Sequence, residues 1–167
     1  MINNLVLRRL RYALNLREAS MVEMFKLVDV TIKATTISGL LKREQQDGFI
    51  ECSDVVLEQF LDGLIISKRG PADPAKAPAP SNAKVRINNN LILKKIRVAL
   101  ELREEHLSEI MQIADFKFSK SEMSAFFRKP GSRQYKPCGD QMLRNFLIGL
   151  CEKNRPSEDK SAQKEDS

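Results

Sequence analysis

The chain has 167 residues, of which 42% are hydrophobic and 30% charged, and its formal net charge is +6 at pH 7. This balance is typical of a soluble globular protein and excludes a disordered one. No apolar run approaches the roughly 18 residues that a membrane span needs, so we expect no membrane segment. Three cysteines and one histidine are too few for a disulfide scaffold or a ribbon-type zinc site. We therefore expect a cytoplasmic location and no metal or cofactor.

A tandem duplication organises the chain. Shifting the sequence by 86 residues aligns residues 3–69 with residues 89–155 without a gap, and 21 of the 67 aligned positions are identical. Helical periodicity matches apolar positions, but it does not explain identities of other types: Asn3/Asn89, Asn4/Asn90, Cys52/Cys138, Asp54/Asp140 and Gly63/Gly149. The sequence predicts two copies of one domain, over residues 1–69 and 87–155.

Two further segments differ in composition from the copies. Residues 70–86 include four prolines and many alanines, which predicts an extended Pro/Ala-rich linker. Residues 156–167 contain charged residues and no large apolar residue, which predicts a disordered charged tail.

Each copy has the pattern of four short helices. In the first copy we expect helices over residues 4–15, after Asn3 as N-cap, and then over 18–28 and 34–43. The fourth helix begins after Ser53 and has the clearest apolar periodicity. In the second copy, Ser119 and Glu122 have the spacing of a capping box at the start of the third helix. Strand-type alternation is missing, so the predicted fold class is all-α.

A helical unit of about 67 residues buries only a marginal core. Either the two copies dock against each other, or the chain forms a dimer. In both cases the equivalent aromatic residues Phe60 and Phe146 of the fourth helices are expected to be fully buried.

Three segments carry a resemblance to a known family: Leu7–Leu14; Glu51–Asp54 with Phe60–Leu64; and Cys138–Leu147. In these segments the chain resembles the bacterial YehS-like family, which consists of two copies of a small helical domain of unknown function. The resemblance covers essentially residues 1–155 and implies a bacterial cytoplasmic protein. It implies no activity, so no functional residue is transferred from it.

The second and third helices of each copy are arranged like a helix-turn-helix reader of DNA. At the start of the third helix, the second copy offers Lys120, Ser121 and Ser124, which have the size and polarity to contact phosphates and base edges. Against this interpretation, the turn has no glycine, is nearer five residues than three or four, and is followed by an acidic residue, Glu122.

Positive charge is concentrated in the second copy. Residues 87–155 contain 13 Lys/Arg and 8 Asp/Glu, against 10 and 9 in residues 1–69. Much of the difference lies in residues 128–136, here called the basic loop, with the cations Arg128, Lys129, Arg133 and Lys136. A basic loop that also contains Tyr135 is suited to grip a phosphate backbone and stack a base. The alternative is a solvated loop whose tyrosine packs on the core.

The first helix of the second copy adds three cations, Lys94, Lys95 and Arg97. They are candidates for the same nucleic-acid surface. However, Arg97 is identical to Arg11 where its neighbours vary between Arg and Lys, which favours a bidentate structural ion pair with a carboxylate such as Asp140 or Glu104.

The cysteines give no indication of catalysis. Cys52 and Cys138 lie two residues before an aspartate, but the lone histidine, His106, aligns with Ser20, so the first copy lacks a base for a nucleophilic thiol. The two thiols are predicted to be buried small residues. We expect no catalytic residue, no metal ligand, no cofactor and no small-molecule substrate.

Two functions remain open on these grounds. The first is a nucleic-acid-binding protein, with a regulatory role as one option, that uses the basic second copy to contact DNA or RNA. The alternative is a protein-interaction or oligomeric adaptor, which includes a homodimer. The charge asymmetry and the helix pair together favour the first.

Overall fold

The computed structural model describes residues 2–70 and 87–155, and this part of the chain is all helical. The first copy contains α1 (Ile2–Leu14), α2 (Glu18–Lys26), α3 (Ala34–Leu40) and α4 (Asp54–Arg69). The second copy contains α5 (Asn89–Leu100), α6 (Glu104–Ile113), α7 (Lys120–Ala125) and α8 (Asp140–Asn154). The predicted all-α tandem fold is confirmed. The linker from residue 71 and the tail from residue 156 lie outside the described residues.

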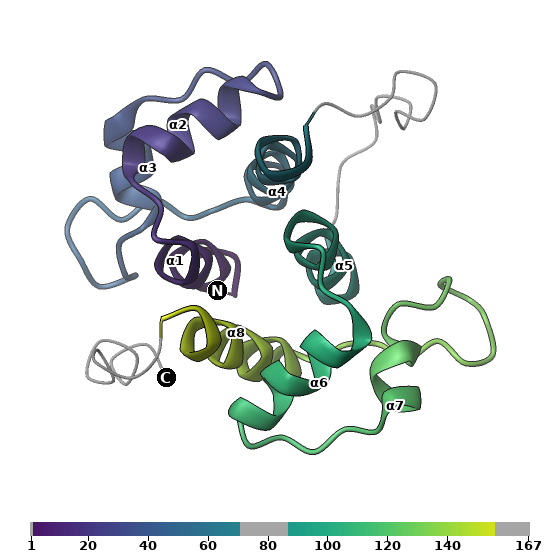
Figure 1. The fold of residues 1–167 in the computed structure, drawn as a ribbon. Coiled ribbons are helices and arrows are strands. Elements are labelled where there is room, and N and C mark those ends of the chain that lie inside the picture. The colour runs from purple at the N-terminus through teal and green to yellow at the C-terminus, as the bar shows by residue number, and fades with distance from the viewer. Residues whose placement is uncertain (1, 71–86, 156–167) are drawn as a thin grey trace.

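The two copies dock through their first and fourth helices: the first helix of each copy packs on the fourth helix of the other copy. The most extensive helix contacts in the molecule join α4 to α5 and α1 to α8, whereas α1 and α4 of the same copy touch only slightly. Since α1 corresponds to α5 and α4 to α8, one type of contact is made twice. Figure 1 shows these four helices at the centre, with α2 and α3 on one side and α6 and α7 on the other.

One hydrophobic core therefore serves both copies. The buried apolar residues of the two copies form a single cluster, and Phe60 and Phe146 have no exposed surface, as predicted. Neither copy depends on the small core that its own length allows, because each buries its first and fourth helices against the other.

The shared glycines permit close helix packing within each copy. A Cβ atom on Gly63 of α4 would lie 2.1 Å from the Met24 carbonyl oxygen of α2. A Cβ atom on Gly149 of α8 would lie 2.1 Å from the equivalent Ile110 carbonyl oxygen of α6. This steric limit explains why both copies have glycine here.

The Asn-Asn pair holds the loop before the fourth helix. The buried Asn4 donates from Nδ2 to the carbonyl oxygens of Leu40 and Ile50, at 3.0 and 2.9 Å, and its Oδ1 accepts from the Cys52 amide at 2.9 Å. Its neighbour Asn3 donates to the Cys52 carbonyl and to Asp54 Oδ1, at 3.1 and 2.8 Å. The Asn-Asn and Cys-x-Asp identities are thus two halves of one hydrogen-bonded clamp.

The second copy repeats this clamp bond for bond. Asn90 donates to the Phe126 and Lys136 carbonyl oxygens at 3.0 and 2.9 Å and accepts from the Cys138 amide at 2.8 Å. Asn89 donates to the Cys138 carbonyl oxygen at 3.1 Å and to Asp140 at 2.7 Å. The bonds to backbone groups satisfy atoms that burial would otherwise leave unpaired, which gives these residues a structural reason for their identity.

Some helix ends differ from the prediction. Asn3 is not an N-cap: it lies inside α1, and in the second copy Asn88 caps α5 by accepting from the Leu91 amide. Ser53 caps α4 and Ser119 opens a capping box with Glu122, as expected. The third helices are shorter than predicted, because they end at Leu40 and Ala125, and the chain then turns back toward the clamp.

Candidate nucleic-acid interface

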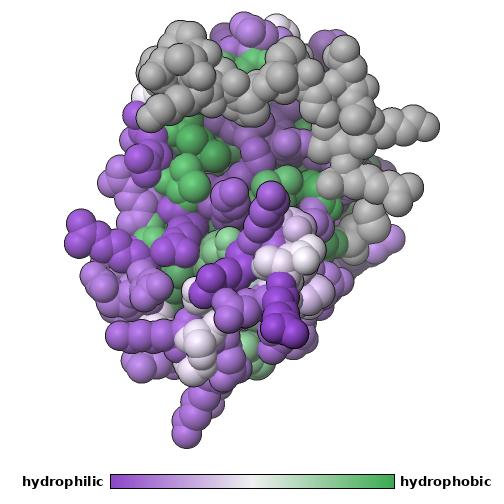
Figure 2. Space-filling model, turned by 90° about the vertical axis from the view of Figure 1, so that its right-hand side faces the viewer, coloured by the Kyte–Doolittle hydropathy of each residue, from purple (hydrophilic) through white to green (hydrophobic). Residues whose placement is uncertain are grey.

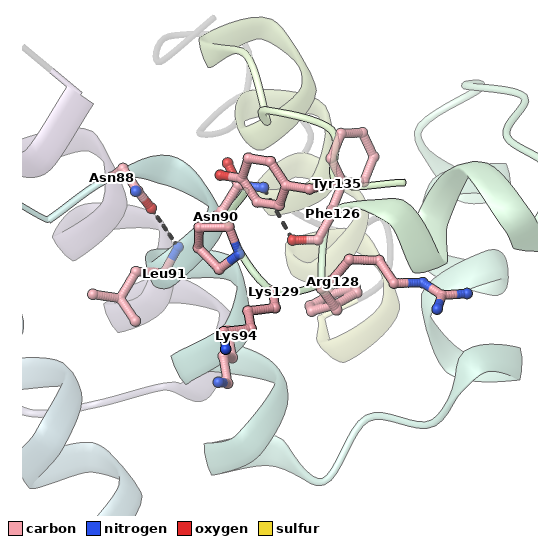
Figure 3. Close-up of a pocket in the computed structure, with 10 residues that line it drawn as sticks. Asn88, Asn90, Leu91, Lys94, Phe126, Arg128, Lys129 and Tyr135 are labelled. Carbon is pink, nitrogen blue, oxygen red and sulfur yellow. Dashed lines mark hydrogen bonds between the residues drawn. The ribbon is translucent and has the colours of Figure 1, made fainter. Parts of the chain in front are cut away.

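The basic loop borders a pocket in the second copy, here called the loop pocket. It has a volume of about 390 Å³ and lies between the start of α5, the end of α7 and the loop (Figure 3). The residues that line it are Asn88, Asn90, Leu91, Lys94, Phe126, Phe127, Arg128, Lys129, Pro130 and Tyr135. The lining thus combines apolar and aromatic side chains with three cations.

The clamp positions the loop. Asn90 ties Phe126 before the loop to Lys136 at its end, and the Lys136 amide donates to the Ala125 carbonyl oxygen at 3.1 Å. Between these points the chain turns tightly, with Gly131 at φ +87°, a conformation that a residue with a side chain rarely adopts. Both ends of the loop are therefore fixed, while its tip projects from the helices.

The cations of this region are available to a ligand. Within residues 2–70 and 87–155, the side chains of Lys94, Arg128 and Lys129 make no hydrogen bond or ion pair, and none of the lining residues is acidic. Arg128 and Lys129 also border a neighbouring hollow of about 340 Å³ that includes Arg133. The side of the molecule where the loop lies in Figure 1 faces the viewer in Figure 2, and it is predominantly hydrophilic.

Two of the predicted cations have structural partners instead. Lys95 lies in the contact between α5 and α4, where it pairs with Asp62 and, at 3.7 Å, with Glu58. Arg97 donates from Nε to the Leu102 carbonyl oxygen at 2.9 Å, and its guanidinium lies 4.5 Å from the centre of the Phe127 ring. The predicted carboxylate partner of Arg97 is wrong, because Asn89 donates to Asp140 and a backbone carbonyl meets the guanidinium.

The start of the third helix lies apart from the loop pocket. Ser121 and Lys120 are exposed, Ser124 is half-buried, and Lys120 borders a separate hollow beside Phe116 and Phe118. Lys136 is exposed as well, with its Nζ 5.8 Å from the ring centre of Phe118.

Ser121 and Ser124 do not share a helix with Arg128, because α7 ends at Ala125. Residues 114–119 join α6 to α7, which is longer than the turn of a typical helix-turn-helix unit. The basic loop, not the third helix, therefore brings the candidate residues together.

Six lining residues were not among the predicted site residues: Asn88, Asn90, Leu91, Phe126, Phe127 and Pro130. They carry no charge, so a search for cations does not select them, and the fold brings all but Pro130 to the pocket from outside the basic loop. By contrast, Tyr135 lines the pocket and is half-buried, which combines both interpretations of this residue.

The thiols of Cys52 and Cys138 have raised pKa values. Burial, with a smaller contribution from the charge of Asp54, raises the pKa of Cys52 to about 12. Burial and Asp140 raise the pKa of Cys138 to about 11. Both thiols therefore stay protonated at neutral pH, and a protonated thiol is a poor nucleophile and metal ligand. In the described ranges, no three His, Cys, Asp or Glu side chains gather as a metal site.

The described residues contain no helix with the length and apolar character to cross a bilayer.

Residues 3–70 and 89–155 each match the family described as "Protein of unknown function (DUF1456)". The chain is also 39% identical over 150 residues to "Uncharacterized protein YehS" of Escherichia coli (strain K12), which covers 90% of this chain and 94% of that protein. No solved structure matches. The chain belongs to the DUF1456 family, to which the YehS-like resemblance pointed.

Proposed function

We propose that this protein binds nucleic acid through the second copy, with the basic loop and the start of α5 as the contact surface. The observation that carries the proposal is the grouping of Lys94, Arg128 and Lys129 around the loop pocket, without an acidic residue in its lining. Arg133 extends the cationic surface along the loop. Such a surface attracts phosphates and releases their counterions on binding.

The adaptor alternative receives less support from the described surface. Its large exposed apolar side chains are Leu27, Ile50, Val55, Val98 and Ile113. They are distributed over both copies, and no single helix carries more than one of them. In contrast, four cations lie together at the loop pocket and the hollow beside it: Lys94, Arg128, Lys129 and Arg133.

Fluorescence-anisotropy titrations test the proposed function. Labelled duplex DNA, single-stranded DNA, single-stranded RNA and heparin are titrated with the full chain at about 50 and 200 mM salt, a range over which phosphate contacts weaken strongly. We expect binding at the lower salt concentration and a loss of affinity at the higher one, because phosphate contacts displace counterions. If the protein binds none of these polyanions at low salt, the proposal is wrong and the protein-interaction alternative is favoured.

A further inference from the structure

We infer that the loop pocket takes one unpaired nucleotide, so that the protein prefers single-stranded nucleic acid over a duplex. This inference rests on the proposed function and adds a substrate class to it. It depends on the volume of the pocket and on its apolar and aromatic lining, neither of which a purely electrostatic surface requires.

The size of the pocket fits one nucleotide. Its volume of about 390 Å³ is near the lower end of the range of roughly 300–1,000 Å³ typical for small-molecule sites. A duplex does not enter a space of this size, whereas a base that is not paired can turn out of its strand and enter.

The lining offers each part of a nucleotide a suitable contact. The ring of Tyr135 provides a surface for stacking, and Leu91 and Pro130 add apolar walls. Lys94 and Lys129 lie at one side of the pocket in Figure 3, away from the tyrosine ring. A base between the apolar walls would thus leave its phosphate near two ammonium groups.

The polar lining residues have distinct roles. Asn90 uses both ends of its amide in the clamp, so its role is structural. Asn88 uses its Oδ1 to cap α5 and makes no further side-chain hydrogen bond among the described residues. Its Nδ2 group is therefore available to donate to a base edge or a sugar.

The test compares three forms of one sequence: a labelled DNA strand of about 12 nucleotides, within the usual span of a single-strand site, the same strand in RNA, and the DNA duplex. For the full-length wild type we expect the single strands to bind at least about tenfold more tightly than the duplex, as stacking of one base allows. Tyr135→Ala should remove most of this preference, while Tyr135→Phe should keep it. Phe49→Ala, the matched change in the first copy, should leave it unchanged.

Heparin separates failure of the inference from failure of the proposed function. Heparin has no base, so Tyr135→Ala should not alter its affinity. If heparin and duplex bind as well as the single strands, or if Tyr135→Ala weakens all probes equally, the pocket assignment is wrong although the proposed function stands. If no probe binds the wild type, both are wrong.

A second measurement uses the wild-type protein alone, so its result does not depend on whether a variant folds. A single strand that carries 2-aminopurine is titrated with the wild type, and its fluorescence should be quenched when the base stacks on the tyrosine. Binding in anisotropy without quenching at any labelled position contradicts the inference.

Discussion

The loop of residues 42–50 in the first copy and the basic loop of the second copy have the same anchors but different interiors. In the first copy, Lys42 Nζ donates to the Asp47 carbonyl oxygen at 2.8 Å, and Arg8 donates to the Lys42 carbonyl oxygen at 3.2 Å. The equivalent residues Arg128 and Lys94 of the second copy make no such bonds among the described residues and instead line the loop pocket.

The two copies therefore share a scaffold but differ in the surface that the loop presents. Asn4 and Asn90 make equivalent hydrogen bonds in both loops, so the backbone anchors are unchanged. Between the anchors of the first copy, the side chain of Lys42 donates to a backbone carbonyl oxygen of the same loop. In the second copy, the side chains of Arg128 and Lys129 are exposed to solvent. The scaffold should therefore respond alike to matched substitutions in the two copies, while binding should respond in one copy only.

The largest expected effect comes from the shared core. Phe60→Ala and Phe146→Ala should each destabilise the protein by about 3–5 kcal/mol, because each removes a fully buried aromatic ring. Chemical denaturation followed by circular dichroism measures both. Since one core serves both copies, each variant should unfold in a single transition. Two separate transitions in either variant would show that the copies fold independently.

Loss of the clamp should have the second-largest effect on the free energy of unfolding. Asn4→Ala and Asn90→Ala should each cost about 2–4 kcal/mol, because each leaves two carbonyl groups and one amide without their partner. Gln112→Ala, at an exposed position of α6, serves as a control for loss of an amide side chain. A cost below about 1 kcal/mol, the value of one ordinary hydrogen bond, in one copy alone would break the equivalence of the two clamps.

The contact between the copies contains an asymmetry that sharpens the comparison. Lys95 pairs with Glu58 and Asp62, but the residues equivalent to these acids in α8 are Arg144 and Ile148. Lys95→Glu should destabilise the protein by about 1–2 kcal/mol, because it places like charges together in a partly buried contact. Adding Asp62→Lys should recover part of the loss. If the Tm of Lys95→Glu equals that of the wild type, this role of Lys95 is contradicted.

At neutral pH the smallest effect comes from the buried thiols, because it develops only above pH 9.0. Unfolded thiols lose their proton near the ordinary pKa of 9.0, while folded Cys52 and Cys138 have a pKa of about 12 and about 11. Their contribution to stability is therefore complete below pH 9.0 and is lost as the pH rises toward these values. Above pH 9.0 the Tm of the wild type should fall more steeply than that of the double variant Cys52→Ala/Cys138→Ala. Parallel curves would argue against buried, protonated thiols.

Much of this architecture could be predicted from the sequence. The ungapped repeat indicated two copies, and the apolar periodicity placed the fourth helix and the buried Phe60 and Phe146. The sequence could not reveal that α1 packs on α8 and α4 on α5, because the same apolar stripes allow packing within a copy or between copies. Asn3 looked like a cap because capping residues are recognised by type alone, whereas its partner lies 51 residues away.

The candidate site was only partly predictable. Charge composition pointed to the basic loop, and the structure brings Arg128 and Lys129 together with Lys94 from a distant helix. The same composition also selected Lys95 and Arg97, since the sequence does not distinguish a solvated cation from one with an acid or a ring as partner. The apolar periodicity predicts third helices longer than the structure has, and α7 ends at Ala125, before Arg128.

One measurement tests the central claim, that the copies share a scaffold but not a binding surface. Arg128→Gln/Lys129→Gln is compared with the matched variant Lys42→Gln/Arg43→Gln in salt-dependent titrations of the full chain with a single strand. We predict that the second-copy variant lowers the slope of log affinity against log salt by up to about 1.4, the share of two phosphate contacts on a single strand. The first-copy variant should leave it unchanged. Equal slopes for both variants would contradict this claim.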